Sequence, residues 1–122
     1  MIGYTTVGTN DIEKATAFYD ALFAEMGAKR TMDFDVFKVW STGEGPGFSV
    51  TLPYNKEAAT VGNGVMIALS APNTETVDRL YAKAMELGAT DEGAPGARGE
   101  GFYAAYFRDL DGNKLNFFHF GG

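Results

Sequence analysis

One short motif occurs twice in the chain, and this duplication restricts the fold more than any other feature of the sequence. Glu25-Met26-Gly27-Ala28 in the first half corresponds to Glu86-Leu87-Gly88-Ala89 in the second half. A helical run of apolar residues precedes each copy, and strand-like segments follow it. A chain of 122 residues is long enough for one domain and too short for two. We therefore expect one domain, residues 1–122, made of two tandem modules.

The periodicity predicts one helix in each module. Apolar residues at helical spacing place the first helix over Asp11–Met26 and the second over Thr74–Leu87. Asn10 and Asn73 stand where a side-chain acceptor caps the first turn. A glycine follows each helix and favours its termination.

Strand signals surround the two helices. In the first half they predict strands at Ile2–Gly8, Lys29–Phe34, Val36–Ser41 and Phe48–Leu52. In the second half they predict strands at Gly64–Ala71, Thr90–Glu92, Phe102–Arg108 and Lys114–Phe120. The order is β-α-β-β-β twice, so the predicted class is α+β. The modules cover residues 1–52 and 64–120, with a connector at 53–63.

Composition restricts the partners and the compartment. The net charge of −6, with scattered Lys and Arg, argues against nucleic acid as a partner. No apolar run approaches the roughly 20 residues that span a bilayer, so we expect no membrane segment. The chain has no cysteine, which fits a reducing compartment, and its start does not resemble a signal peptide. We expect a cytoplasmic protein.

Strand alternation predicts a face that lines a cavity. One face of each sheet should pack on its helix, with residues such as Val65, Ile67 and Leu69. The other face mixes rings, hydroxyls and an amide, as small-molecule sites do. Its members are Tyr4, Thr6, Ser49, Thr51, Met66, Asn116 and Phe118. Tyr4 and Asn116 either contact a ligand or only form hydrogen bonds with each other or with water in the interior. Met66 either lines the cavity or fills space in it.

Three further places carry candidate ligand contacts. The glycine-rich segment Glu92–Gly101 is either a mobile loop or a flap whose Arg98 binds an anion. Tyr103 and Tyr106 follow it on opposite faces, so at most one of them points into the cavity. Trp40 is either a stacking platform in the cavity or an aromatic residue of a dimer contact.

Two segments resemble the vicinal oxygen chelate superfamily, which includes glyoxalase I, extradiol dioxygenases and bleomycin-resistance proteins. They are the helix start Asn10–Tyr19 and the closing segment Phe107–Asn116, with its Asp-x-Asp-Gly-Asn hairpin. Together with the duplicated modules, the resemblance covers nearly the whole chain. It implies strands wrapped into an incomplete barrel around a cleft, and a homodimer.

The resemblance also implies metal-ligand positions, and this chain lacks the usual ligands there. The corresponding residues are Tyr4, Ser49 or Thr51, Met66 and Asn116, where metal-using members have mostly His and Glu. The single histidine, His119, is expected on the helix side or exposed, and Asp109 and Asp111 fit a tight turn. We therefore expect no metal and no cofactor.

The sequence leaves three functions open. The first is a glyoxalase/bleomycin-resistance-like protein that binds a small molecule in a metal-free cleft, for sequestration or detoxification. The second is a glyoxalase-type lyase or isomerase with a non-standard metal or a metal-independent site. The third is a non-catalytic interaction module.

Overall fold

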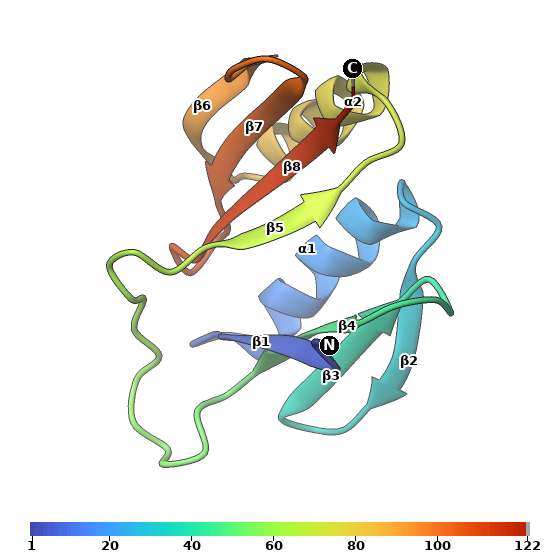
Figure 1. Ribbon diagram of the computed structural model, residues 1–122. Coiled ribbons are helices and arrows are strands. Elements are labelled where there is room, and N and C mark those ends of the chain that lie inside the picture. The colour runs from blue at the N-terminus through green and yellow to red at the C-terminus, as the bar shows by residue number, and fades with distance from the viewer. Residues whose placement is uncertain (122) are drawn as a thin grey trace. The chain divides into compact units, whose positions relative to one another are not determined.

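The computed structural model describes residues 1–121, which form two compact units divided between Val61 and Gly62. Each unit contains a four-stranded sheet and one helix (Figure 1). The order of elements is β-α-β-β-β in both, so the predicted α+β class with two such modules is confirmed. The division between the units falls inside the segment 53–63.

The two units have the same strand order. In the first, β1 (Tyr4–Gly8), α1 (Ile12–Ala24), β2 (Lys29–Asp33), β3 (Phe37–Ser41) and β4 (Gly47–Thr51) form a sheet of order β1-β4-β3-β2. In the second, β5 (Ile67–Ser70), α2 (Thr74–Glu86), β6 (Thr90–Ala97), β7 (Phe102–Arg108) and β8 (Lys114–Phe120) form the order β5-β8-β7-β6. β1 pairs with β4, and β5 with β8, in parallel; the other pairs are antiparallel.

Each helix buries one apolar stripe on its own sheet. In α1 the buried residues Tyr19 and Phe23 contact the rings of Trp40 and Phe48 on β3 and β4. In α2, Val77, Leu80 and Ala84 are fully buried, and the helix packs on β6, β7 and β8. Burying a Val, Leu or Phe side chain contributes roughly 1.5–3 kcal/mol, so each stripe holds its helix on the sheet.

The first helix is capped by a different residue from the one predicted. Asp11, not Asn10, is the N-cap, and its Oδ1 accepts from the Lys14 backbone N–H at 3.1 Å. Asn10 instead binds Ala59 twice, accepting from its N–H at 2.7 Å and donating to its C=O at 3.2 Å. Asn73 caps α2 as predicted and accepts from the Thr76 N–H.

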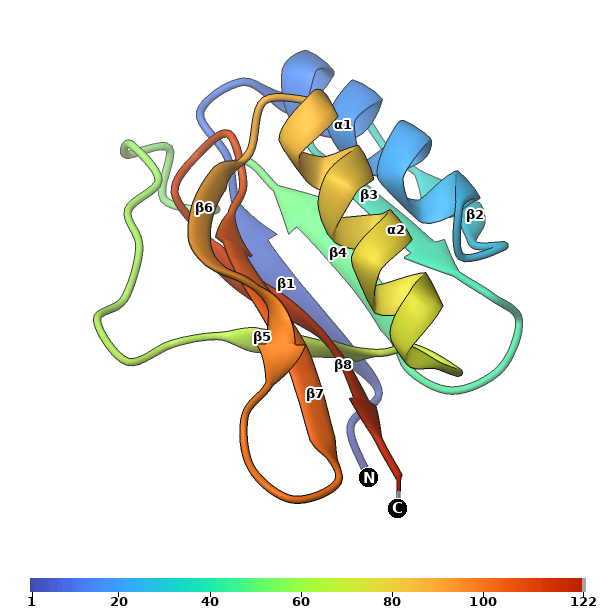
Figure 2. The ribbon, with the colours of Figure 1, turned by 90° about the horizontal axis from the view of Figure 1, so that it is seen from above.

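Two strands differ from their predicted lengths. β5 is limited to Ile67–Ser70, so Met66 precedes it, and Val65, expected under a helix, is 60% exposed. β6 runs to Ala97 through residues predicted as a loop, and Figure 2 shows it as one arm of a hairpin with β7. Its pairing register shifts twice, as β-bulges do, which allows glycine-rich sequence to stay in a sheet.

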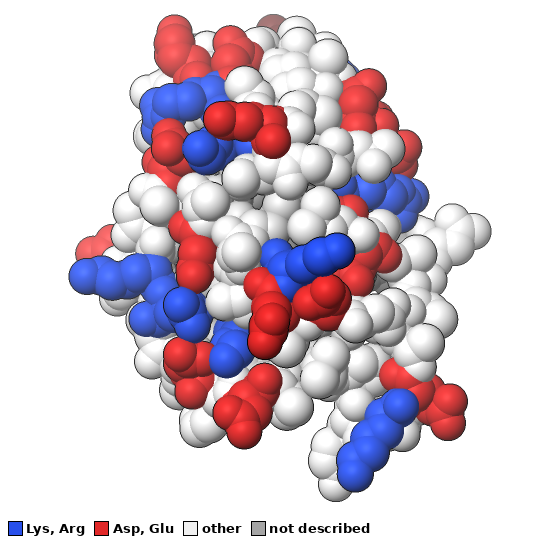
Figure 3. Space-filling view, turned by 180° about the vertical axis from the view of Figure 1, so that it is seen from behind, with Lys and Arg blue, Asp and Glu red and all other residues white. Residues whose placement is uncertain are grey.

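Charged side chains of both signs are interspersed on the face shown in Figure 3. Among the described residues, no helix is long and apolar enough to cross a membrane.

Candidate functional site

In each unit, one face of the sheet packs on the helix and the other, which we call the helix-free face, does not. Trp40 and Phe48 contact α1, so their sequence neighbours Val39 and Ser49 lie on the helix-free face of the first sheet. In the second unit, Tyr103 binds α2, so even-numbered residues of β7 lie on the helix-free face.

Thr6 and Ser49 form a hydroxyl pair on the helix-free face of the first sheet. They are register partners on β1 and β4, with 2.7 Å between their oxygens. Ser49 Oγ donates its only proton to the Thr5 carbonyl at 2.7 Å. The proton between the two hydroxyls therefore belongs to Thr6. Thr6 is exposed and Ser49 is buried, so Thr6 presents acceptor lone pairs outward.

Tyr4 lies at the start of β1 beside a cavity of about 440 Å³. Tyr4 is 62% exposed, and its ring stands edge-on to Phe37, with 6.3 Å between centroids. Within residues 1–121 its hydroxyl has no hydrogen-bond partner. The cavity is lined by Gly3, Tyr4, Thr31, Met32, Phe37, Val39, Ser41, Gly45 and Gly47. A phenol with a free hydroxyl beside an apolar hollow is suited to binding a ligand.

Thr51 lines a second cavity, of about 780 Å³, where β4 leads into the connector. Its hydroxyl contacts the carbonyls of Val36 at 3.0 Å and Leu52 at 2.8 Å, so it serves the local backbone. The same cavity is lined by Tyr54 and Lys56 of the connector, which Asn10 holds through Ala59. Both cavities fall in the size range of small-molecule pockets.

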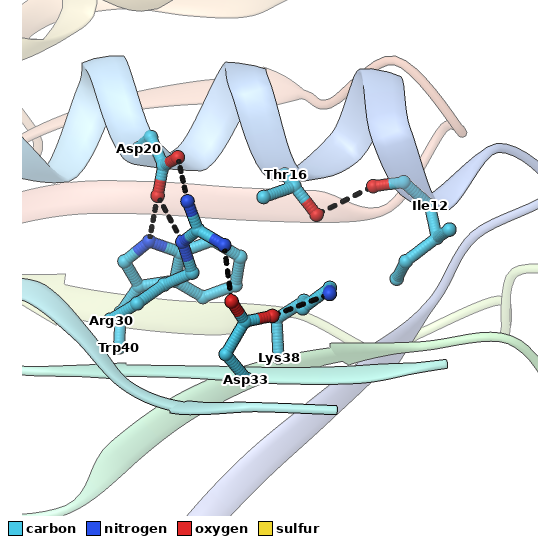
Figure 4. Close-up of polar contacts among 7 residues, drawn as sticks. All are labelled: Ile12, Thr16, Asp20, Arg30, Asp33, Lys38 and Trp40. Atoms are coloured by element: carbon cyan, nitrogen blue, oxygen red, sulfur yellow. Dashed lines mark hydrogen bonds and ion pairs between the residues drawn. The ribbon is translucent and has the colours of Figure 1, made fainter. Parts of the chain in front are cut away.

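Trp40 is not part of the helix-free face, which corrects the expectation for it. It is 1% exposed and lies beneath α1, and its indole N–H donates to Asp20 Oδ1 at 2.8 Å. Figure 4 shows this bond together with Arg30, which lies between Asp20 and Asp33. Neither a cavity platform nor a dimer contact is compatible with a ring buried in this way, so Trp40 is a core residue.

Asn116 is the most unusual polar residue of the second unit. It lies in the middle of β8, is 1% exposed, and its Oδ1 has no hydrogen-bond partner within residues 1–121. Its register partners are Ala68 on β5 and Tyr106 on β7. A buried acceptor without a donor costs about 1–3 kcal/mol.

The two tyrosines of β7 lie on opposite faces, as alternation predicts. Tyr103 donates to Asp78 Oδ1 of α2 at 2.6 Å, and this hydrogen bond raises the pKa of its phenol. Tyr106 lies on the helix-free face opposite Asn116. Tyr103 is therefore a helix-docking residue, and Tyr106 is the one available to a ligand there.

The remaining candidates lie on or near the same face of the second unit. Arg98 follows β6 and folds back, donating to the Ala94 carbonyl at 2.6 Å, with its guanidinium 5.6 Å from the Tyr106 ring centroid. Phe118 stacks on Phe102 with 5.7 Å between centroids. Met66 is 40% exposed and precedes β5.

Sequence reasoning missed Phe37, Lys114 and Phe102, which contact candidate residues. Phe37 touches Tyr4, Lys114 lies over Tyr106, and Phe102 stacks on Phe118. For Lys114 a signal was present, because it shares the alternation of Asn116 and Phe118 on β8. His119 has the opposite alternation, and its Nδ1 lies 3.1 Å from the Ala71 carbonyl, as expected for a helix-side residue.

The residues at the implied metal positions do not fit a transition metal. A phenol, hydroxyls, a thioether and a carboxamide are poor ligands for Zn, Ni, Mn or Fe. Within the described part of the chain, no group of three or more His, Cys, Asp or Glu side chains is placed to hold an ion. Asn116 Oδ1 would be a single neutral donor.

Comparison with known proteins identifies the family. The model of the Glyoxalase/Bleomycin resistance protein/Dioxygenase superfamily matches residues 1–117. A glyoxalase/bleomycin resistance protein from Albidiferax ferrireducens is 34% identical, with 98% of each chain covered and a TM-score of 0.90. A hypothetical protein from S. aureus is 29% identical over 95% of this chain and 91% of that one, with a TM-score of 0.76.

More distant structures share the fold. A lactoylglutathione lyase from Agrobacterium tumefaciens is 20% identical, over 98% of this chain and 92% of that one, with a TM-score of 0.74. A comparison with curated proteins finds no match. The match over residues 1–117 and the 34% identical relative agree with the duplicated β-α-β-β-β units. The chain belongs to the Glyoxalase/Bleomycin resistance protein/Dioxygenase superfamily.

Proposed function

We propose that this protein binds a small organic molecule without a transition metal, and that it serves sequestration or detoxification. The observation that carries the proposal is the buried, unpartnered Oδ1 of Asn116. Buried polar atoms are almost always hydrogen-bonded, so this exception requires an explanation, and we infer that a bound ligand supplies the missing donor. The helix-free face of the second sheet is the proposed contact surface.

We also propose ligand contacts for the first unit, considered by itself. Tyr4 offers a free phenol beside the cavity of about 440 Å³, Thr6 offers acceptor lone pairs, and the other cavity of this unit measures about 780 Å³. Ser49 orients Thr6, and Thr51 lines the larger cavity. Hydroxyls and an aromatic ring favour a ligand that is partly apolar and carries a few polar groups.

The sheet edges favour a homodimer, which we propose as the state in solution. The edge strands β2 and β6 carry charges and register shifts, which discourage further strand pairing. The edge strands β1 and β5 carry neither charge nor proline. Sedimentation equilibrium at micromolar concentration tests this proposal, and a single species of 13.1 kDa would contradict it. A cytoplasmic location remains part of the proposal.

A thermal-shift screen tests the binding function. The compounds are metal salts, thiol conjugates, fosfomycin, bleomycin and aromatic metabolites, each against the purified wild type and its variants. A ligand at 100 times its dissociation constant should stabilise the fold by about 2.7 kcal/mol. Tyr4→Phe tests the proposed contacts of the first unit and Asn116→Ala those of the second, and the variant that removes a ligand contact should reduce that response. A response that neither variant reduces would show that the ligand binds elsewhere.

Metal analysis separates this proposal from the glyoxalase-type alternative. We expect the protein, purified without chelators, to contain no stoichiometric transition metal, because its donor set is unsuited to one. A stoichiometric metal lost from Asn116→Ala would instead support a lyase or isomerase with a non-standard site. An interaction module would show no ligand-dependent shift at all.

A further inference from the structure

Two positively charged side chains converge on one ring of the second unit. The Arg98 guanidinium carbon and the Lys114 Nζ each lie 5.6 Å from the centroid of Tyr106. Arg98 follows β6 and Lys114 begins β8, so the two side chains reach Tyr106 of β7 from the two strands that flank it. Both distances are within the range of cation–π attraction. The chain has 10 Lys and Arg against 16 Asp and Glu, so two converging cations are unusual here.

Neither cation has an acidic partner in the described part of the chain. Arg98 donates to the Ala94 carbonyl, and the Lys114 ammonium group lies over the tyrosine ring without an ion pair within residues 1–121. Glu92 of β6 is occupied, because its Oε1 accepts from Arg108 Nε at 3.0 Å. Since no carboxylate among the described residues neutralises either side chain, an anion bound on this face would supply the missing countercharge.

Two glycines of β6 make room for Arg98. A Cβ on Gly96 would lie 2.9 Å from Arg98 Nη1. A Cβ on Gly93 would lie 3.3 Å from Arg98 Nη2 and 3.2 Å from Tyr106 Cδ1. Larger residues at these positions would displace the guanidinium from the ring. The placement of Arg98 therefore depends on the composition of the strand beneath it.

Asn116 adds an independent requirement on the same face. It lies directly opposite Tyr106 in the β7–β8 register, and its buried Oδ1 lacks a donor. Cross-strand partners have Cβ atoms about 4.5–5.5 Å apart. A molecule whose anionic group reaches the two cations would thus pass Asn116, where an N–H or O–H group would satisfy the oxygen.

The alternation of β8 orders these features in a line. Lys114, Asn116 and Phe118 share the helix-free face, and Phe118 stacks on Phe102. At about 3.3 Å per residue, the Cα atoms of Lys114 and Phe118 are about 13 Å apart. The Lys114 ammonium group lies over Tyr106, which is level with Asn116, so its charge is only about 7 Å from Phe118 along the strand. A positive charge beside a hydrogen-bond acceptor is therefore followed by an aromatic surface along a single strand.

We propose that this face recognises an elongated organic anion. Its carboxylate or phosphate binds Arg98 and Lys114, an N–H or O–H group beside it donates to Asn116 Oδ1, and its apolar or aromatic end packs on Phe118. This inference rests on the proposed binding function and names the class of ligand.

Calorimetric titration with a matched set of probes tests the inference. The first probe, 2-hydroxy-3-phenylpropanoate, has the anion, the hydroxyl and the ring. 3-Phenylpropanoate lacks the hydroxyl, the methyl ester of the first probe lacks the charge, and phenyl phosphate replaces the carboxylate. We expect loss of either the hydroxyl or the charge to weaken binding at least tenfold. Equal affinities of acid and ester, or no binding of either anion at millimolar concentration, would overturn the inference.

Variants that remove the two positive charges provide a second test of the inference. Arg98→Gln and Lys114→Gln together should weaken the acid at least tenfold and leave the ester unaffected. Lys29→Gln is the matched control, because Lys29 is an exposed cation of β2 in the other unit. Far-ultraviolet circular dichroism checks that each variant is folded. An unchanged affinity for the acid in the double variant would overturn the inference.

The outcomes also separate this inference from the proposed function. If a compound of the thermal-shift screen binds in an Asn116-dependent way and the double variant binds it as tightly as the wild type, only the anion inference fails. If no compound produces an Asn116-dependent response, the proposed function fails as well.

Discussion

Trp40 on β3 donates its indole N–H to Asp20 on α1 at 2.8 Å, and this bond joins the helix to its sheet. The same carboxylate receives Arg30 Nε at 3.0 Å and Nη2 at 3.1 Å. Arg30 also pairs with Asp33, as Figure 4 shows. Because Trp40 is 1% exposed, its N–H has no access to water as an alternative partner.

The first prediction concerns this bond. Asp20→Ala should destabilise the protein by about 2 kcal/mol, because it leaves the buried indole N–H unsatisfied. Asp20→Asn keeps an acceptor and loses only the exposed pairing with Arg30, so it should cost less than about 1 kcal/mol. Urea denaturation measures both. Asp35→Asn is the control, because this exposed carboxylate has no partner among the described residues. If the alanine and asparagine variants lost the same free energy of unfolding, Asp20 could not be the acceptor that the Trp40 N–H requires.

The second prediction concerns the hydrogen bond from the Tyr81 hydroxyl to Asp91 Oδ1, which is 2.7 Å long. This bond raises the pKa of Tyr81, so its contribution to stability is present below pH 10 and is lost as the pH rises through the raised value. It also lowers the pKa of Asp91, so that contribution is present above pH 4 and is lost as the pH falls through the lowered value.

Tyr81→Phe should therefore lower the melting temperature most near neutral pH. Wild type and variant should converge in strong acid and strong alkali, where the wild-type bond is also lost. Melting temperatures measured from pH 2 to pH 12 check this. Tyr4→Phe is a matched control, because that hydroxyl has no partner within residues 1–121, and its curve should run parallel to the wild type. A constant difference for Tyr81→Phe across the whole range would contradict the prediction.

The spacing of apolar residues along the chain was sufficient to predict the fold, because it indicates which face of each helix and strand is buried. The helix stripes and the strand order β-α-β-β-β followed directly from it. The failures arose where a nonlocal partner decided the outcome. Asn10 and Asp11 are both good caps in sequence, but in the structure Asn10 binds Ala59 and Asp11 caps the helix. Gly93 and Gly96 suggest a loop, yet backbone pairing with β7 holds them in a strand.

The sequence predicted on which face of a sheet the candidate residues lie. It did not predict which hydrogen bonds their side chains form. Alternation placed Tyr4, Thr6 and Asn116 away from the helices, because a strand has only two faces. It could not show that Trp40 has an acceptor on α1, since that bond depends on how the helix packs. It also could not show that Asn116 lacks a partner, because this depends on every neighbouring side chain.

The third prediction follows from the orphaned oxygen of Asn116. Asn116→Leu should raise the free energy of unfolding by about 1 kcal/mol in the absence of ligand, because it removes a buried acceptor that has no donor. The same change should abolish the ligand response expected of the wild type. Chemical denaturation and calorimetric titration measure the two effects. A destabilised Asn116→Leu would indicate that the oxygen has a partner in the free protein, and the proposed role would then be wrong.

The fourth prediction concerns the space that Gly96 leaves for Arg98. In Gly96→Ala the new methyl group would lie 2.9 Å from Arg98 Nη1, which is the far end of a flexible side chain. The guanidinium should therefore move off Tyr106 at a cost in stability below about 1 kcal/mol, while affinity for 2-hydroxy-3-phenylpropanoate falls. A double-mutant cycle decides whether the loss acts through Arg98. Added to Arg98→Gln, Gly96→Ala should produce no further loss, since the group that it displaces is already absent. A full additional loss in that background would mean that the glycine acts on the strand itself.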